Sequence, residues 1–497
     1  MYDLIIKNGS IIDGTGSPSY QADIAIQDGK IVRISKGIES GKNVIDARGL
    51  TVTPGFIDSH SHSDRSILTF PDQIEKIEQG ITTSIAGQCG SSPAPRKRDT
   101  QIYTMSNFLN DARNVPQGSN IAVFAGHSTI RSAVMGMENR VPTEEELDQM
   151  KSLLREAMEH GALGVSFGLI YPPSCYAQTP ELIALAKVVA QYHGLVAAHV
   201  RQEGDFLIKS TAEFIKILKE AGVRGIHSHF KSMGKENWGK VQHALRMLDQ
   251  ANEEGTEIYC DVYPYSASCT SLGVRFVPKE YHSLGLNKVL TDSSTRQQIK
   301  EWNLNYWGED LSWVMVTQCS AYPQYERMMV PDIAKLHGKD GYETIFDMVM
   351  SGTCQGCFFM MCEEDIENVL AYPRAMICTD AGVAGTNTSY HPRLRGSFPR
   401  VLGRYVRERN VTTLPEMIRK MTAMPATVYG LHSKGLLKEG FDADLCIFDA
   451  NKIMDHAGFT DCHKRAEGLN YVILSGQVVV TDAVYNGIKA GKLILRV

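Results

Sequence analysis

Strand-sized apolar runs alternate with helical stretches through the middle of this 497-residue chain, and this alternation limits the folds open to it. Helical patterns and short runs of aliphatic residues follow one another at 143–160, 164–166, 180–192, 195–198, 206–221 and 258–262. Such alternation is typical of a parallel sheet, and a closed barrel of this kind takes about 250 residues. We therefore expect an α/β fold built around a TIM-like (β/α)8 barrel.

The two ends of the chain differ from the middle. Residues 1–53 and 428–497 contain short aliphatic runs, and Asn-Gly and Asp-Gly dipeptides, which are typical hairpin turns, interrupt those at the amino-terminal end. We expect both ends to form one small β-sandwich beside a catalytic barrel at 54–427. The rhythm is broken at about 270–370, where we expect an insertion in the barrel.

Composition excludes several classes of partner. The formal net charge is −5, and no basic stripe of the kind that nucleic-acid binders need is visible. No run approaches the roughly 20 apolar residues of a membrane-spanning helix, so no membrane partner is expected. The amino terminus lacks the pattern of an export signal, which predicts a cytoplasmic protein with reduced thiols. The sequence does not predict an oligomeric state.

The most informative short segment is 52–62, in which an apolar strand ends in His60-Ser61-His62. Side chains two residues apart on a strand point to the same side, so both imidazoles would project together. Barrel enzymes place their chemistry at the carboxyl ends of the strands. The alternative is a pair of surface histidines in a serine-rich loop.

Later strand ends carry further polar residues that can bind metals. Cys89 and His199 each follow a short apolar strand, His227 and His229 follow another, and Asp380 ends a fourth. Spacing alone does not decide between His227 and His229. The alternatives are a buried structural cysteine, core histidines, and an aspartate that caps a helix or a turn.

The chemistry of these residue types points to one site. Imidazole, thiolate and carboxylate groups are zinc ligands, and a carboxylate can also carry a proton between water and a leaving amine. Because strand ends converge at the mouth of a barrel, we expect these residues to meet there despite their separation in sequence.

The chain resembles the N-acyl-D-amino-acid deacylase (D-aminoacylase) family of the amidohydrolase superfamily, and the resemblance extends over nearly the whole sequence. The strings that carry it are GFIDSHSHSD at 55–64, GQCG at 87–90, HVRQE at 199–203, SHFK at 228–231, DVYPY at 261–265, HPRLRGSFPRVLGRYVRE at 391–408 and KGLLKEGFDADLCIFD at 434–449. The first and last indicate the superfamily, whereas GQCG, HVRQE, SHFK and the string at 391–408 are more specific to the deacylases.

The resemblance implies a metal centre. Its ligand sets would be Cys89, His199 and His229 for a tightly bound Zn²⁺, and His60, His62, Asp380 and a shared Cys89 for a second, weaker position. Many members of the superfamily use a lysine to bridge their metals. The matching segment here, 162–168, contains no lysine, which agrees with a bridging role for Cys89.

The resemblance also implies the activity, which is hydrolysis of an N-acyl-D-amino acid by a metal-activated water with Asp380 as general base and acid. Lys231, Tyr263 and Arg393 would hold the substrate carboxylate. Three alternatives remain: a cyclic-amide hydrolase of the hydantoinase or dihydroorotase type, a non-catalytic binding homologue, and a cysteine hydrolase with Cys89 as nucleophile and His199 as base.

Overall fold

The computed structural model describes residues 1–98, 101–383 and 390–496, and its centre is a ring of parallel strands. Its strands are β6 (Phe56–Asp58), β7 (Ile81–Ala86), β10 (Asn120–Val123), β11 (Ala125–Gly126), β12 (Gly164–Gly168), β13 (Leu195–His199), β14 (Arg224–His227), β15 (Ile258–Val262) and β19 (Ala375–Ile377). β10 pairs with β7 and β11 with β12, so these two short strands share one position in a ring of eight. The predicted barrel is confirmed.

The ring closes between its first and last strands. The Ser59 amide donates to the Ile377 carbonyl at 3.2 Å, the Asp380 amide to the His60 carbonyl at 2.9 Å, and the His62 amide to the Ala381 carbonyl at 3.0 Å. Residues separated by more than 300 positions therefore lie side by side. This closure places the His-x-His segment next to Asp380.

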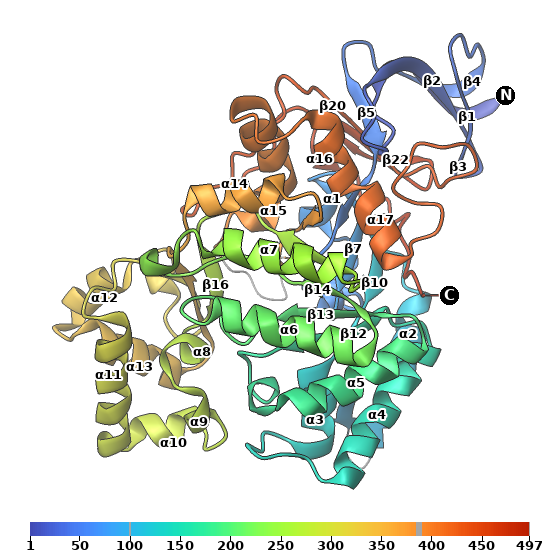
Figure 1. The fold of residues 1–497 in the computed structure, drawn as a ribbon. Coiled ribbons are helices and arrows are strands. Elements are labelled where there is room, and N and C mark those ends of the chain that lie inside the picture. The colour runs from blue at the N-terminus through green and yellow to red at the C-terminus, as the bar shows by residue number, and fades with distance from the viewer. Residues whose placement is uncertain (99–100, 384–389, 497) are drawn as a thin grey trace.

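Helices cover the outside of the ring, as Figure 1 shows for α3 to α7. They include α1 (Ile74–Ile77), α2 (Met105–Arg113), α3 (His127–Met135), α4 (Glu144–Glu159), α5 (Thr179–Gln191), α6 (Leu207–Ala221), α7 (Lys240–Glu253), α14 (Glu363–Ala371), α15 (Arg393–Arg400), the π-helix η5 (Val401–Glu408), α16 (Leu414–Met421) and α17 (Ala423–Tyr429). Several begin at side-chain caps: the Thr143 hydroxyl accepts the Glu146 amide at the start of α4.

Side chains alternate between the barrel interior and the helix layer. On β13, Leu195 and Ala197 belong to the cluster that fills the barrel, whereas Val196 and Ala198 pack in the core beneath the helices. This period of two continues to His199, which ends the strand on the interior side. The apolar strand β13 thus places the imidazole of His199 at the mouth of the barrel.

Both ends of the chain join one nine-stranded sheet, coloured blue and red in Figure 1. Its strands are β1 (Tyr2–Ile11), β2 (Tyr20–Gln27), β3 (Lys30–Ser35), β4 (Gly41–Asp46), β5 (Thr51–Pro54), β20 (Leu445–Phe448), β21 (Leu469–Leu474), β22 (Gln477–Thr481) and β23 (Val484–Tyr485). β5 and β20 pair antiparallel and join the two ends. The predicted fold class is confirmed in this respect also.

Between β15 and β19 the chain builds a separate unit, whose helices lie to one side of the barrel in Figure 1. It contains β16 (Ser268–Ser271), α8 (Leu272–Phe276), α9 (Lys279–His282), α10 (Leu286–Thr291), α11 (Ser293–Trp307), β17 (Val314–Cys319), α12 (Val330–His337), α13 (Gly341–Ser351) and β18 (Cys354–Phe358). Its apolar residues form a core of their own. The residue limits expected for the three parts of the chain stay predictions.

Across 1–98, 101–383 and 390–496, every helix is too short or too polar to cross a bilayer.

Candidate metal centre

Cys89 lies among three imidazoles at the mouth of the barrel. Its Sγ is 3.3 Å from Nε2 of His60, 3.3 Å from Nε2 of His229 and 3.7 Å from Nδ1 of His199. All four side chains are buried. They come from four different strand ends, and the barrel brings them together as the sequence predicted.

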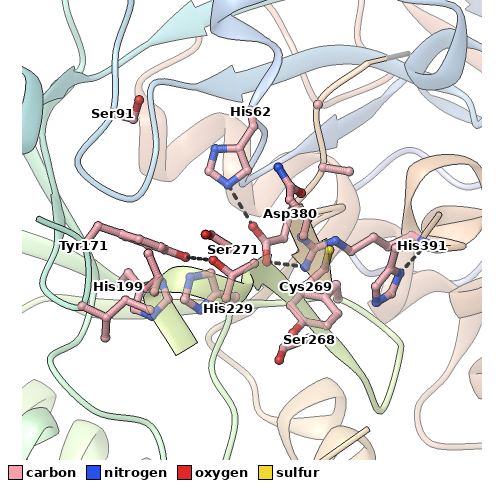
Figure 2. Close-up of a pocket in the computed structure, with 18 of the residues that line it drawn as sticks. His62, Ser91, Tyr171, His199, His229, Ser268, Cys269, Ser271, Asp380 and His391 are labelled. Atoms are coloured by element: carbon pink, nitrogen blue, oxygen red, sulfur yellow. Dashed lines mark hydrogen bonds and ion pairs between the residues drawn. The ribbon is translucent and has the colours of Figure 1, made fainter. Parts of the chain in front are cut away.

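Asp380 and His62 complete a second group around the same thiol. Oδ1 of Asp380 is 3.0 Å from Nε2 of His62 and 3.5 Å from Nε2 of His60. Figure 2 shows His62 above Asp380, with His199 and His229 beside them. In each group, Cys89–His199–His229 and His60–His62–Cys89–Asp380, one donor atom per residue lies within 4.8 Å of all the others.

The charges of this centre fit a metal cation. Burial raises the pKa of Cys89, but His60 and His229 outweigh it and hold that pKa well below its ordinary value. Burial lowers the pKa of His62, but Asp380 and Cys89 raise it to about 9. The buried negative charges of the Cys89 thiolate and the Asp380 carboxylate favour a positive charge beside them. Together with the imidazole nitrogens, this sulfur and this oxygen form a donor set of the kind that binds zinc and related ions.

Three of these residues have an unusual backbone. Cys89, His229 and Asp380 have φ values of 52°, 35° and 47°, in the left-handed region that side chains other than glycine rarely adopt. Each such residue costs on the order of 1–3 kcal/mol and persists only where its surroundings impose it. Three at one site, each directing a donor atom inward, agree with a functional centre.

The left-handed turn at His229 also decides between the two histidines after β14. His227 stays in strand geometry, and its ring packs against Phe230 and against Phe214 of α6, with centroid distances of 4.4 and 5.9 Å. Burial lowers the pKa of His227 to about 3, so it is neutral. Because the chain turns between the two residues, His227 and His229 face different surroundings, and of the two it is His229 that lies beside the thiol.

Two acids behind the imidazoles were not singled out from the sequence. Oε1 of Glu203 is 3.0 Å from Nδ1 of His229 and 2.6 Å from Nζ of Lys231. Oδ1 of Asp261 accepts the His229 amide at 2.6 Å and lies 3.5 Å from Nδ1 of His60. Carboxylates in this position orient ligating histidines. Both occur in strings that carry the family resemblance, HVRQE and DVYPY, but only the fold shows which ring each one faces.

A buried ion pair fixes the loop that carries Asp380. The ammonium of Lys76, fully buried, lies 2.9 Å from Oδ2 of Asp58 and donates to the Thr379 hydroxyl at 2.6 Å and the Ala381 carbonyl at 2.7 Å. No spacing in the sequence indicates this contact, because Lys76 and Ala381 are 305 residues apart.

We expect Lys76→Met to lower the free energy of unfolding by about 3–5 kcal/mol, because it leaves Asp58 as an unpaired buried charge. Urea denaturation followed by circular dichroism measures the change. The double variant Lys76→Met/Asp58→Asn should recover part of the loss, since the unpaired charge is then removed. A loss below about 1 kcal/mol would show that water replaces the ammonium.

The three residues expected to hold a substrate carboxylate lie together beside the metal ligands. The centroid of the Tyr263 ring is 5.6 Å from Nζ of Lys231 and 5.0 Å from the guanidinium of Arg393. Arg393 also donates to Oδ2 of Asp380 at 2.6 Å. The pKa of Asp380 is raised by burial, but Arg393 and His229 lower it well below its ordinary value, so the carboxylate is ionised.

Lys231, Tyr263 and Arg393 border one cavity of about 440 Å³, part of which Figure 2 shows. His62, His199, His229 and Asp380 lie on its barrel side, and residues of β16 and α8 form the facing wall. Tyr171 connects the two sides, because its ring packs on His199 at 5.2 Å and its hydroxyl is 3.3 Å from that of Thr270. The cavity is large enough for a small amide bearing a carboxylate.

Known proteins share this architecture. The D-aminoacylase of Alcaligenes xylosoxydans xylosoxydans is 32% identical over 100% of this chain and 98% of its own length. The crystal structure of N-acyl-D-glutamate deacylase from Bordetella bronchiseptica, complexed with zinc and a phosphonate mimic of the tetrahedral intermediate, has a TM-score of 0.87, 31% identity and full coverage of both chains. A D-aminoacylase structure described for its binuclear metal centre, with one-metal activation and second-metal attenuation, gives the same values.

The amidohydrolase family model matches residues 43–242 and 375–480, which include the metal-ligand candidates and part of the terminal sheet. The unmatched stretch between these ranges covers the separate unit from β16 to β18. This chain therefore belongs to the amidohydrolase family and, within it, to the branch of D-aminoacylase and the N-acyl-D-amino-acid deacylases.

Proposed function

We propose that this protein is a zinc-dependent hydrolase that cleaves the amide bond of N-acyl-D-amino acids and releases a carboxylate and a free D-amino acid. The observation that carries the proposal is that four members of the two ligand groups line one cavity together with Lys231, Tyr263 and Arg393; these four are His62, His199, His229 and Asp380. The names of two relatives, D-aminoacylase and N-acyl-D-glutamate deacylase, indicate that they act on N-acyl-D-amino acids.

We assign Cys89, His199 and His229 to a tightly held zinc. The second group, in which His60, His62 and Asp380 share Cys89, would hold a weaker ion, as a binuclear relative suggests. When bound, zinc lowers the pKa of a coordinated water from about 16 towards about 7 and polarises the scissile carbonyl. Glu203 supports this assignment, because it holds the far nitrogen of His229 and thereby fixes the direction of Nε2.

Asp380 is the residue that we assign to proton transfer. Its carboxylate is ionised and can accept a proton from the attacking water at Oδ1, the oxygen that faces His62 and His60. Returning that proton to the departing nitrogen lets the C–N bond break. The Arg393 contact at Oδ2 keeps the carboxylate in one orientation during both transfers.

Arg393, Lys231 and Tyr263 would bind the carboxylate of the substrate. One guanidinium nitrogen of Arg393 is engaged by Asp380, which leaves other N–H donors available. Lys231 and Tyr263 line the same cavity, with the Lys231 ammonium 5.6 Å from the centroid of the Tyr263 ring. A carboxylate fixed there would orient the amide of an N-acyl amino acid towards the metal ligands.

The screen that tests the proposal uses the zinc-loaded protein with N-acetyl, N-formyl and N-succinyl D- and L-amino acids, together with hydantoin and dihydroorotate. We expect turnover of linear D-substrates, loss of turnover with a chelator, and recovery when Zn²⁺ is added back. Turnover of the cyclic amides in preference to linear ones would instead identify a hydantoinase-like enzyme. A metal-free protein without turnover on any member of the panel would favour a binding homologue. A cytoplasmic location rests on the sequence and stays a prediction.

A further inference from the structure

A second hollow borders the metal centre beside the substrate cavity. It has a volume of about 960 Å³ and lies between residues of four segments, 62–69, 88–97, 128–137 and 171–173. Cys89, the ligand common to both groups, lines this hollow, and His62 lines both the hollow and the cavity. The candidate metal centre therefore lies between the two spaces.

The hollow and the anchors for the substrate carboxylate lie on opposite sides of this centre. Figure 2 shows Ser91 and Tyr171, which line both spaces, on one side of Asp380. His391, which accepts the Arg393 amide at 3.1 Å, lies on the other side. An N-acyl amino acid whose carboxylate is held by Arg393 and whose carbonyl lies at the metal ligands therefore directs its acyl group away from the anchors and towards the hollow.

Apolar side chains form much of the wall of the hollow. Phe108 of α2, Ala133 of α3 and Pro95 are buried in that wall. Leu68 and Met137 also line the hollow, and 39% and 45% of their surfaces are exposed. Exposed apolar surface gathered in a groove is typical of a binding site, because an alkyl chain that covers it removes it from contact with water.

The cations of the hollow lie at its rim. Arg65, Arg96 and Lys97 are exposed, so water solvates them, and within residues 1–98, 101–383 and 390–496 no aspartate or glutamate lines the hollow. A neutral alkyl chain can therefore enter without removing a carboxylate from water. The volume of the hollow is in the range that holds a drug-sized ligand, which is far more than the methyl group of an acetyl substrate fills.

We propose that this hollow binds the acyl chain of the substrate, so that the enzyme prefers N-acyl-D-amino acids with medium-length alkyl chains over their N-acetyl counterparts. This inference rests on the proposed deacylase function. The amino-acid half of the substrate then occupies the cavity with the carboxylate anchors, and the acyl half occupies the hollow beyond His62 and Cys89. Cleavage at the metal ligands separates the two halves where the two spaces meet.

The test measures kcat/KM of the zinc-loaded enzyme for substrates that differ only in the length of the acyl chain. These are the N-acetyl, N-butyryl, N-hexanoyl and N-octanoyl derivatives of the D-amino acid that is best accepted in the screen above. Complete burial of one CH2 group is worth about fourfold in kcat/KM. We therefore expect a rise of about two- to fourfold per CH2 until the chain fills the hollow, and a ratio of N-octanoyl to N-acetyl of about 50 or more.

Two variants change the hollow at exposed positions. Ser132→Trp, on α3, adds a large side chain to its wall and should reduce the ratio of N-octanoyl to N-acetyl to within about 3-fold of unity, because the chain is shut out. Met137→Ser removes apolar surface and should lower that ratio by about 5- to 10-fold. Leu336→Ser removes an exposed apolar side chain of α12 and is the matched control, with an unchanged ratio. If neither hollow variant folds, wild-type inhibition by acetate, butyrate, hexanoate and octanoate measures the same discrimination, and we expect it to strengthen with length.

A wild-type kcat/KM that stays within about 3-fold across the series, or an unchanged ratio in a folded Ser132→Trp, would overturn the inference and leave the deacylase function intact. Faster turnover of the N-succinyl than of the N-butyryl derivative would also overturn it, because the rim cations would then select a charged acyl group. Absence of turnover on every member of the series contradicts the proposed function itself. Cleavage of the N-acetyl substrate thus distinguishes the two failures.

Discussion

Cys89→Ala is expected to lose bound metal and activity together. Its Sγ is the atom common to both ligand groups, within 3.3 to 3.7 Å of three imidazole nitrogens, so its removal opens both metal positions at once. The Lewis-acid contribution to such reactions is several kcal/mol, which corresponds to about 10³-fold or more in kcat. Metal content by mass spectrometry and turnover of the best N-acyl substrate are measured on the same preparation.

Cys175→Ala is the matched control, because Cys175 is also buried and free of disulfide bonds but belongs to neither ligand group. Burial raises its pKa to about 11, so it is a neutral thiol. This variant should keep its zinc. An active, zinc-free Cys89→Ala protein would contradict the shared-ligand role, and an inactive one with full metal content would instead support Cys89 as a nucleophile.

The second large effect concerns Asp380→Asn, which we expect to fold and retain the zinc held by Cys89, His199 and His229 while kcat falls by about 10²–10⁴-fold. Asparagine has nearly the same volume and tolerates the left-handed backbone found at this position, where φ is 47°. It can no longer accept a proton from water at neutral pH. The comparison therefore isolates proton transfer from packing and from backbone strain.

Zinc content, the thermal unfolding midpoint and kcat together evaluate this variant. A protein with wild-type metal content and kcat within about 3-fold of wild type would show that Asp380 has been misassigned. Asp148→Asn, at an exposed position on α4, controls for the loss of one carboxylate and should change none of the three.

Much of the candidate centre could be predicted from the sequence because barrel topology converts strand order into proximity. His60, His62, Cys89, His199 and Asp380 each follow an apolar strand, and eight strands closed in a ring must bring such ends together. Because imidazole, thiolate and carboxylate groups all bind zinc, the residue types at these strand ends then indicated a metal centre.

What could not be predicted depends on backbone turns and on contacts between distant segments. The choice between His227 and His229 rests on one positive φ value, which the period of a strand does not reveal. The pairing of Lys76 with Asp58 and the orientation of Glu203 towards His229 require the closed barrel. Arg275 lies in the region where the strand–helix rhythm is lost, so no spacing indicated its place in the cavity wall.

The unit from β16 to β18 has a consequence for how enzymes of this kind diversify. Its apolar core is formed by residues between Leu272 and Phe358, separate from the core under the barrel helices, and it presents Arg275 to the cavity. Mutations there can alter which molecules are accepted while the reacting atoms keep their surroundings. Selection can therefore explore new substrates on this wall without first giving up the reaction.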